Sequence, residues 1–311
     1  MQQAEKQSGA TWALGDLRVD RVGFGAMRLT GRTAFDRGSR SDRGRAIRLL
    51  RRAVELGVDH IDTAAFYFSP LRSANELINS ALAPYPDGLV IATKVGPARD
   101  IDGAWATPAR PDQLRGQVEE NLRQLGRDHL DLVNLRLMGQ DDVSEHFGAL
   151  AELREAGLVR HLGLSGARPE HLAQAQEIAP VVCVQNRYSL DSRSGEEMLR
   201  ICAAQGIAFV PFFSVAGDGR EAGAVGAEHD EVRAVARAHG VSSARVRLAW
   251  TLHQGPHVLA IPGTGDPEHL ADNVAARTLR LSEDELRLLD TVGHGAARRS
   301  DHHTDQHSDQ R

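Results

Sequence analysis

The fold of this chain is constrained most by a regular alternation of short apolar segments with longer segments of helical periodicity. Each apolar segment has the length and composition of a buried strand, and each is followed by at least one helical segment. Apolar character throughout such short lengths is typical of a parallel sheet that helices cover on both faces. We place eight strands, the first of which follows a small hairpin within residues 17–25 and ends at Gly23 and Gly25, and the others at residues 58–61, 89–93, 130–137, 159–165, 181–185, 207–213 and 257–263.

Eight strand–helix units in 311 residues predict an α/β protein with the (β/α)8 TIM barrel fold. In such a barrel the functional side chains lie at the C-terminal ends of the parallel strands. The alternative is a doubly wound open sheet, which would carry a glycine-rich fingerprint after its first strand. Gly23 and Gly25 lack the third glycine at the required spacing, so the barrel is the favoured fold.

The two ends of the chain differ from the region between them. Residues 1–14 are predicted to be a mobile arm, and residues 15–293 a single barrel domain that begins with a short hairpin. Ser282 and Glu285 have capping-box spacing, which predicts a C-terminal helix. Residues 294–311 form a polar, histidine-rich tail that we expect to be disordered, because it can bury little apolar surface.

Charge and cysteine content exclude several classes of function. The formal net charge is −5 with both signs interspersed, which gives no basic footprint for a nucleic acid. The sequence shows neither an apolar leader nor an apolar run of membrane-spanning length, so no membrane partner is expected. Cys183 and Cys202 lie in apolar segments, which favours buried free thiols in a reducing compartment. We therefore expect a cytoplasmic protein.

An acid, a tyrosine and a lysine follow two successive predicted strands. Asp62 ends strand 58–61, Tyr67 comes five residues later, and Lys94 closes strand 89–93. If these strands are parallel neighbours, the three side chains meet at one rim. There the lysine ammonium would lower the pKa of the tyrosine, and the carboxylate would keep the lysine charged. A tyrosine tuned in this way can pass a proton to a carbonyl oxygen near neutral pH.

The other strand ends also carry polar or conformationally special residues. Each of them alone has a structural explanation as a turn, a partner for rim backbone groups or part of the core. Their common position at one rim of a barrel is what indicates a functional site. These residues are Gly25, Arg136, Ser165, Gln185, Phe212 and Gly263.

The loop and helix after the last predicted strand indicate a phosphate-binding site. Residues 262–265 are rich in glycine, Asp266 is placed to cap the next helix, and Pro267 fits its first turn. A helix N-terminus presents free N–H groups to anions. In barrels, phosphate sites are often built from the loops after the seventh and eighth strands. The alternative is an ordinary connection between a strand and a helix.

Taken in order, these residues resemble the aldo-keto reductase superfamily over about residues 15–292. The matching stretches are GFGAM, HIDTAAFY, IATKVG, DLVNLR, GLS, QN and IPGTGDPEHLADN, which begin at residues 23, 60, 91, 131, 163, 185 and 261. Within the superfamily, the stretches DLVNLRLMG, VVCVQNRY, FVPFF and IPGT are most similar to the bacterial pyridoxal reductase-like (pyridoxine 4-dehydrogenase-like) branch.

The resemblance implies a barrel that binds NADP(H) in extended form and passes a hydride from the nicotinamide to a carbonyl carbon. It implies that Tyr67 is the general acid, that Lys94 and Asp62 tune it, and that no metal takes part. Ser165 and Gln185 are expected to hold the nicotinamide carboxamide, and Phe212 to stack on the ring. The full set of implied cofactor-binding residues is Gly25, Met27, Asp62, Ser165, Gln185, Phe212, Phe213, Ser214, Gly263, Thr264, His269, Asp272 and Asn273.

The sequence departs from the family pattern at several of these positions. Arg136 stands where the family usually has the histidine of its catalytic tetrad, and Gly166 where it usually has an asparagine. Gly263 and His269 replace the common cations for the adenosine 2′-phosphate. A fixed cation at position 136 can stabilise the developing oxyanion or hold an acceptor group of the substrate. The structural alternative is that Arg136 forms an ion pair with a carboxylate, such as that of Asp62.

The sequence therefore predicts an NADPH-dependent carbonyl reductase. It would reversibly convert a small aldehyde or ketone into an alcohol, with pyridoxal and pyridoxine as the first substrate pair to test. Two alternatives stay open. One is a tailoring ketoreductase for a sugar or secondary metabolite, and the other is a low-turnover NADP(H)-binding sensor or partner subunit. The intact set of Asp62, Tyr67 and Lys94 favours an enzyme. No oligomeric state is predicted.

Overall fold

The computed structural model describes residues 11–31, 42–100, 104–215 and 228–300, with side chains as far as residue 292. Residues 1–10, 32–41, 101–103, 216–227 and 301–311 lie outside the described residues. Within the described ranges, a parallel sheet of seven strands has the same order in space as in the sequence. The strands are β3 (Phe24–Gly25), β4 (His60–Asp62), β7 (Val90–Val95), β8 (Leu130–Arg136), β9 (Val159–Ser165), β10 (Val181–Gln185) and β11 (Ala208–Phe209).

One further segment joins the two edges of this sheet. On the β11 side, Leu259 N donates to Phe209 O at 2.9 Å. On the β3 side, Gly23 N donates to Ala260 O at 2.8 Å, and Val22 and Ala260 form a parallel bridge. Because both edges bond to one segment, the sheet closes on itself as a parallel α/β barrel, and the open doubly wound alternative is wrong. The segment forms isolated bridges rather than a regular strand. The prolines that flank it, Pro256 and Pro262, have no N–H to donate.

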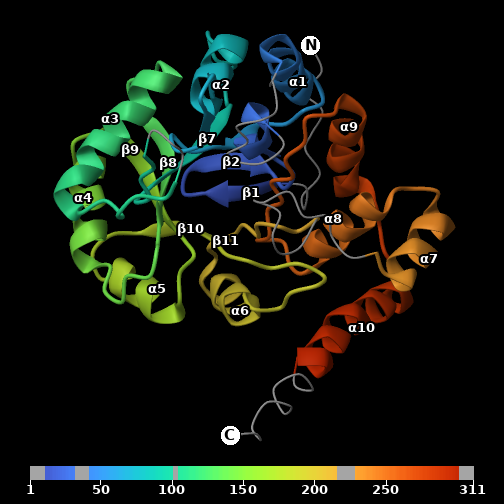
Figure 1. Cartoon of the computed structure of the whole chain (residues 1–311). Coiled ribbons are helices and arrows are strands. Elements are labelled where there is room, and N and C mark those ends of the chain that lie inside the picture. Colours follow the sequence, from blue (N-terminus) through green and yellow to red (C-terminus); the bar gives the residue numbers. More distant parts are fainter. Residues whose placement is uncertain (1–10, 32–41, 101–103, 216–227, 301–311) are drawn as a thin grey trace, which may run out of the picture.

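Helices cover the outside of the sheet (Figure 1). They are α1 (Arg43–Glu55), α2 (Ala74–Leu82), α3 (Leu114–Leu125), α4 (Ser144–Glu155), α5 (Pro169–Gln176), α6 (Glu196–Gln205), α7 (Asp230–His239), α8 (Ser243–His253), α9 (Pro267–Ala275) and α10 (Glu283–Ser300), with 3-10 turns η1 (Ala26–Thr30), η2 (Pro111–Gln113) and η4 (Ala276–Thr278). Local chemistry sets their ends: Asp42 caps α1 by accepting from Arg45 N, and Gly126 ends α3 with a φ of 63°.

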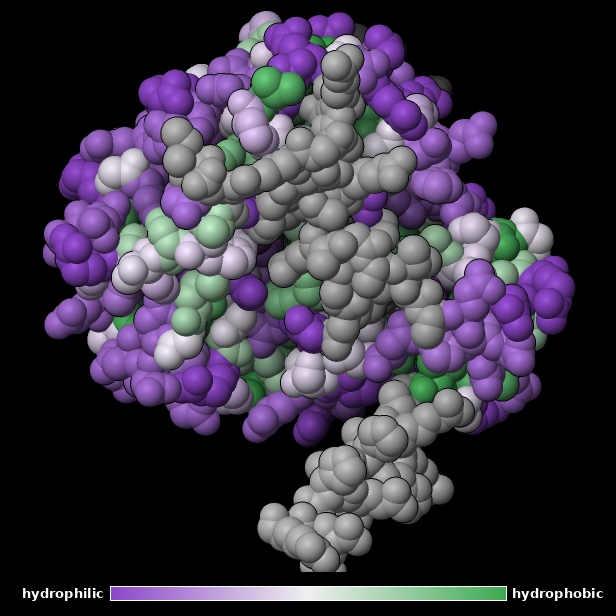
Figure 2. Space-filling model, viewed as in Figure 1, coloured by the Kyte–Doolittle hydropathy of each residue, from purple (hydrophilic) through white to green (hydrophobic). Residues whose placement is uncertain are grey.

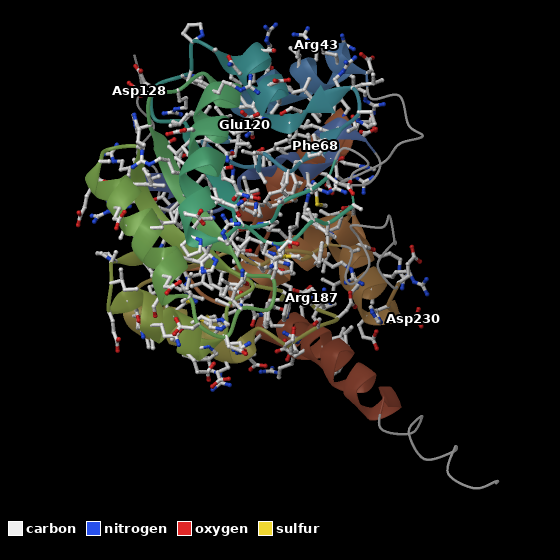
Figure 3. All side chains as sticks on the ribbon, turned by 60° about the vertical axis from the view of Figure 1, so that its left-hand side comes forward. Arg43, Phe68, Glu120, Asp128, Arg187 and Asp230 are labelled. Carbon is white, nitrogen blue, oxygen red and sulfur yellow. The ribbon has the colours of Figure 1, made fainter. Side chains whose placement is uncertain are left out.

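Amphipathic helices such as α1 turn their apolar face inward and their polar face outward. In α1, for example, Leu49, Leu50 and Ala53 are buried in the core between helix and sheet. Figure 2 shows hydrophilic residues over most of the outer surface, and charged side chains such as Asp128 and Asp230 lie on the outside in Figure 3. Within the described residues, no helix is both long and apolar enough to cross a membrane.

A hairpin fills the N-terminal end of the barrel. It consists of β1 (Thr11–Leu14) and β2 (Leu17–Asp20), which pair antiparallel. Leu14 and Val19 are buried against strand residues inside the barrel, including Val90 at the start of β7. The opposite end, where the strands have their C-termini, is therefore the end available for a binding site. A second, two-stranded hairpin, β5 (Phe68–Ser69) with β6 (Arg72–Ser73), lies at this end after β4.

The two predicted chain ends need correction. Residues 11–14 belong to strand β1, so this part of the predicted arm is wrong and the hairpin begins earlier than residue 15; residues 1–10 lie outside the described residues. The burial of Leu14 against the barrel explains why this segment is ordered. At the other end, α10 continues to Ser300, so residues 294–300 of the predicted tail are helical, and residues 301–311 lie outside the described residues. Alanine and arginine at 296–299 favour a helix.

Candidate active site

Side chains from the C-terminal ends of the strands surround one cavity of about 440 Å³. Asp62 is the last residue of β4, Lys94 the last but one of β7, and Ser165 and Gln185 the last residues of β9 and β10. Parallel register sets Arg136 opposite Ser165 and Ser165 opposite Gln185. The ends of parallel strands thus bring residues that are far apart in the sequence to one rim.

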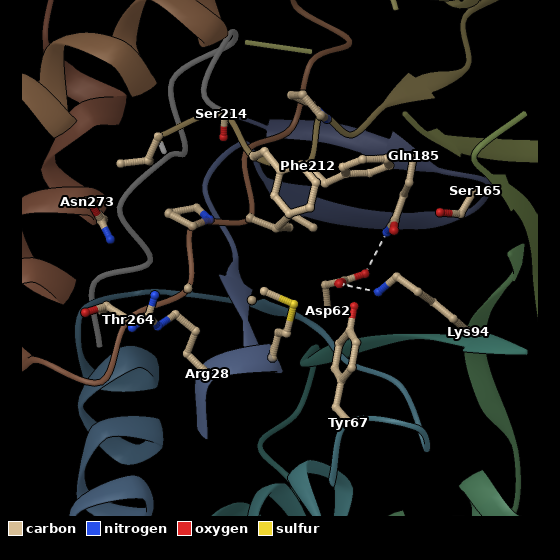
Figure 4. Close-up of a pocket in the computed structure, with 18 of the residues that line it drawn as sticks. Arg28, Asp62, Tyr67, Lys94, Ser165, Gln185, Phe212, Ser214, Thr264 and Asn273 are labelled. Atoms are coloured by element: carbon tan, nitrogen blue, oxygen red, sulfur yellow. Dashed lines mark hydrogen bonds and ion pairs between the residues drawn. The ribbon is translucent and has the colours of Figure 1, made fainter. Parts of the chain in front are cut away.

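Asp62, Lys94 and Tyr67 form the polar centre of the cavity (Figure 4). Lys94 Nζ donates to Asp62 Oδ1 at 2.5 Å and to the carbonyl oxygen of Thr63 at 3.1 Å. It lies 5.1 Å from the centroid of the Tyr67 ring, whose hydroxyl points toward Asp62 and Lys94. Asp62 and Lys94 are buried, whereas the Tyr67 ring is half-buried because it lines the cavity.

The protonation of this group differs from the sequence prediction in one respect. Burial raises the pKa of Tyr67, and the positive charge of Lys94 opposes this shift without reversing it. The expectation that Lys94 brings the pKa of Tyr67 below its ordinary value is therefore wrong, because desolvation of the phenolate is the larger effect. Burial also acts to lower the pKa of Lys94, but the Asp62 carboxylate and Tyr67 outweigh it, and the pKa of Lys94 is raised. The structure thus holds a neutral phenol beside a charged ammonium.

Asp62 also fixes the orientation of Gln185. The amide Nε2 of Gln185 donates to Asp62 Oδ2 at 2.6 Å, so the amide oxygen Oε1 must face the other way. That oxygen is buried and accepts no hydrogen bond from the described residues. Within the same part of the chain, the hydrogen bonds of Asp62 go to Lys94 and Gln185, and the alternative pairing of Asp62 with Arg136 is not formed.

Aromatic and sulfur-containing side chains form the mouth of the cavity. Phe212 and Phe213 lie edge to face with ring centroids 5.0 Å apart, and Phe213 has a φ of 66°, which is rare for a bulky residue. On the other side, the Phe66 ring lies edge to face with the half-exposed ring of Trp105, and their centroids are 5.7 Å apart. Met138 lines the cavity beside them.

Phe68 does not line this cavity. Phe68 instead lines a neighbouring cavity of about 480 Å³. That second cavity shares Phe66 and Lys94 with the first and lies against α3, which contributes Gln117 to it. Lys94 therefore stands between the two cavities.

The far end of the main cavity lies between η1, the loop 262–265 and α9. Here the backbone at Gly25 approaches that at Gly263 so closely that a Cβ atom on either glycine would lie 2.6 Å from a carbonyl oxygen of the facing segment. Glycine is thus required by the space and not by the dihedral angle. The buried side chains of Thr264 and Asn273 line this end.

The start of α9 differs from the phosphate site that the sequence predicted. Asp266 accepts hydrogen bonds from the backbone N–H groups of Glu268 and His269, at 2.8 and 3.3 Å. The expectation of free N–H groups at this helix N-terminus is therefore wrong, because the capping carboxylate uses them. Positive charge at this end comes instead from Arg28, whose side chain points toward Thr264 (Figure 4).

All the residues predicted from the sequence line this single cavity, and the sequence missed a further group of residues that also line it. The predicted ones are Gly25, Met27, Asp62, Tyr67, Lys94, Arg136, Ser165, Gln185, Phe212, Phe213, Ser214, Gly263, Thr264, His269, Asp272 and Asn273. The missed ones include Arg28, Phe66, Trp105, Met138 and Ser242. They sit on turns and loops, where no periodic pattern indicates which way a side chain points. In the part of the chain that the structure describes, no cluster of acidic, histidine or cysteine side chains is suited to a metal ion.

A family model and similar named proteins point to the same family. Residues 21–294 match the model of the aldo/keto reductase family. The chain is 41% identical over 292 residues to the Escherichia coli strain K12 protein named pyridoxine 4-dehydrogenase, covering 92% of this chain and 99% of that protein. It is 36% identical over 290 residues to an uncharacterized oxidoreductase of Schizosaccharomyces pombe, covering 93% and 92%.

Solved structures agree with this result. An aldo-keto reductase from Klebsiella pneumoniae in complex with NADPH aligns with a TM-score of 0.74 at 26% identity, over 88% of this chain and 91% of that one. A thermostable aldo-keto reductase in complex with the inhibitor epalrestat aligns with a TM-score of 0.76 at 28% identity, over 90% and 97%.

Proposed function

The chain belongs to the aldo/keto reductase family, and we propose that it is an NADPH-dependent enzyme that reversibly reduces the carbonyl group of a small aldehyde or ketone. The observation that carries this proposal is the Tyr67 hydroxyl beside the buried Lys94–Asp62 pair at the wall of an aromatic-lined cavity. A neutral phenol next to a fixed ammonium is a proton donor whose conjugate base is already stabilised.

The residues present fit a nicotinamide dinucleotide. The buried oxygen of Gln185 needs a donor, which a carboxamide supplies. Gly25 and Gly263 line the cavity, and because they carry no side chain an extended ligand would meet only their backbone there. The cavity continues from Tyr67 to Asn273, as a dinucleotide with one reactive end requires. Gly263 and His269 stand where the family usually has cations for a phosphate, and Arg28 offers a positive charge in their place.

The proposed mechanism uses these groups as follows. When bound, the reduced nicotinamide supplies a hydride to the carbonyl carbon. Tyr67 donates its hydroxyl proton to the carbonyl oxygen, and the C=O double bond becomes a C–O–H group. Because burial raises the pKa of Tyr67, the hydroxyl carries its proton at neutral pH. Lys94, kept charged by Asp62, stabilises the phenolate that remains, and the low local dielectric strengthens that interaction.

The mouth of the cavity favours a flat or aromatic carbonyl compound. Phe66, Trp105 and Met138 present faces on which a ring can stack. The relative from E. coli is named pyridoxine 4-dehydrogenase. We therefore propose pyridoxal, a ring aldehyde, as the first substrate to test, and a tailoring ketoreductase as the second candidate.

An NADPH-oxidation assay over a panel of carbonyl compounds tests this proposal. The panel includes pyridoxal, an aromatic aldehyde without ring substituents, an aliphatic aldehyde, a cyclic ketone and a keto sugar. We expect turnover with at least one ring aldehyde, and the Tyr67→Phe variant controls for background oxidation. Tight NADPH binding with no turnover on any member would favour the sensor or partner-subunit alternative instead.

Three further proposals concern the number of strands, the extent of the domain and the location of the protein. We count the segment 257–262, which bridges both sheet edges, as the eighth strand of a (β/α)8 barrel. We take the barrel and α10 as one domain, since Leu289 of α10 is buried in the same core. We propose a cytoplasmic location because Cys183 and Cys202 are buried free thiols.

A further inference from the structure

Arg136 and Gly166 occupy the same small region of the rim. Gly166 follows β9 and has a φ of +70°, a conformation that L side chains rarely adopt. A Cβ atom at this position would lie 2.6 Å from Arg136 Nη1 and 3.3 Å from its Cζ. Such approaches are too close for non-bonded atoms, so the guanidinium in this position occupies space that a side chain at position 166 would need, and one of the two would have to move. The two departures from the family pattern are therefore physically coupled.

The guanidinium of Arg136 lies beside Ser165 and Phe212. Its Nη1 donates to Ser165 Oγ at 3.4 Å, and its Cζ lies 5.2 Å from the centroid of the Phe212 ring. The strand ends fix this position, because Leu137 N donates to Ser165 O at 2.8 Å and Gly166 N to Gln185 O at 2.9 Å. Arg136, Ser165 and Gln185 consequently form a row across three adjacent strands.

This row offers donors at one end and an acceptor at the other. Arginine carries only N–H donors, and the serine hydroxyl can donate or accept. Gln185 has its Nε2 committed to Asp62, so it presents the buried oxygen Oε1, which accepts no hydrogen bond from the described residues. A primary carboxamide carries one acceptor oxygen and two N–H donors. Its polarity is complementary to that of the row.

Resting on the proposed function, we propose that Arg136 binds the carboxamide oxygen of the nicotinamide, in place of a side chain at position 166. Gln185 then accepts from the carboxamide NH2 group. Arg136 is thereby a residue that orients the cofactor, and not one that holds the substrate or the developing oxyanion. Its planar fork keeps the carboxamide, and with it the ring, in one orientation.

Binding titrations of the full chain test this assignment, with two probes. One probe is NADPH, and the other is 2′-phospho-ADP-ribose, which lacks the nicotinamide ring and its carboxamide. Arg136→Met should raise the Kd of NADPH about tenfold, the usual effect of losing a charge-assisted hydrogen bond, and change the Kd of 2′-phospho-ADP-ribose less than about twofold. Arg136→Lys keeps the charge without the fork and should give an intermediate loss, which covers the case that Arg136→Met does not fold.

A second pair of variants tests the coupling with Gly166. Gly166→Asn alone should weaken NADPH binding, because the new side chain meets the guanidinium, although asparagine tolerates a positive φ better than most residues. Adding Arg136→His removes that contact, so the double variant should bind NADPH about tenfold more tightly than Gly166→Asn. Additive losses in the double variant would contradict the shared space.

The assignment fails if Arg136→Met leaves the Kd of NADPH unchanged and instead raises the KM of the carbonyl substrate. That result would assign Arg136 to substrate binding and would leave the proposed reductase function intact. Failure of the unmodified chain to bind either probe would overturn the proposed function itself, and this assignment with it.

Discussion

Replacing Tyr67 by phenylalanine is the most informative single change in the proposed mechanism. The substitution removes the hydroxyl that points toward Asp62 and Lys94 and keeps the ring, which packs edge to face on Phe66 at 5.2 Å. Lys94 keeps its bonds to Asp62 and to the carbonyl oxygen of Thr63, so its charge stays satisfied. We therefore expect the stability of the fold to change by less than about 1 kcal/mol.

The expected kinetic effect follows from what remains in the site. A general acid contributes typically about 10²- to 10⁴-fold to a rate. Since the Lys94 ammonium still lies near the developing oxyanion, the loss should fall in the lower part of that range, about 10²- to 10³-fold in kcat. This corresponds to about 3–4 kcal/mol in the activation barrier. The Kd of NADPH should stay within about twofold.

Steady-state reduction of the best carbonyl substrate, with NADPH binding and thermal unfolding in parallel, provides the assay. Tyr85→Phe is a matched control, because the Tyr85 hydroxyl donates to Leu125 O at 2.6 Å outside the cavity. Its loss should cost about 1 kcal/mol of stability and leave kcat unchanged. Turnover of Tyr67→Phe within a few-fold of the unmodified chain would remove Tyr67 from the mechanism.

Three further outcomes are expected. Arg28→Met should raise the Kd of NADPH about tenfold with little change for NADH, as measured by titration, and equal effects on the two cofactors would assign Arg28 elsewhere. Because the pKa of Tyr67 is raised, the hydroxyl keeps its proton and kcat for carbonyl reduction should stay level up to about pH 10. The rate of alcohol oxidation should still increase with pH in that range. A reduction rate that falls near neutral pH would refute this. Burial lowers the pKa values of His171 and His257, so the unfolded chain binds more protons below about pH 6.5. The melting temperature should therefore fall as pH decreases through that value, and less steeply in His257→Gln; identical pH profiles for the two proteins would contradict the assignment.

The sequence was sufficient for the barrel and for the position of its polar rim. Short apolar strands that alternate with helices leave few ways to close a sheet, and parallel register then brings the residue at each strand end to one place. That is why Asp62, Lys94, Ser165 and Gln185 could be placed together from sequence order alone. The segment predicted as the eighth strand forms isolated bridges to both sheet edges, so the count of eight strands stays a prediction.

The sequence was insufficient where the outcome depends on distances between loops and on burial. Arg28 lies on a 3-10 turn and Trp105 on a loop, and neither position has a periodicity that reports its direction. The direction of the Tyr67 pKa shift depends on a balance between desolvation and the charge of Lys94, which only a structure provides. The cap at Asp266 was predicted, but its consequence for the N–H groups of α9 was not.

The space shared by Arg136 and position 166 is another feature that depends on distances and cannot be predicted from the sequence. In the sequence they are two separate departures from a pattern. Only the 2.6 Å separation that a Cβ atom at position 166 would have from Arg136 Nη1 shows that the guanidinium occupies the space such a side chain would need.

The most direct test of the whole account is the transfer of deuterium from NADPH labelled at C4 of the nicotinamide. The purified chain would be supplied with each of the two singly labelled stereoisomers and pyridoxal, or the best substrate of the carbonyl panel, and the alcohol analysed by mass spectrometry. We predict that one stereoisomer, and not the other, adds one deuterium to the former carbonyl carbon, at a rate about 10²-fold or more lower in Tyr67→Phe. An alcohol without deuterium from either stereoisomer, or no alcohol from any carbonyl compound, would contradict the claim that this site reduces carbonyl groups.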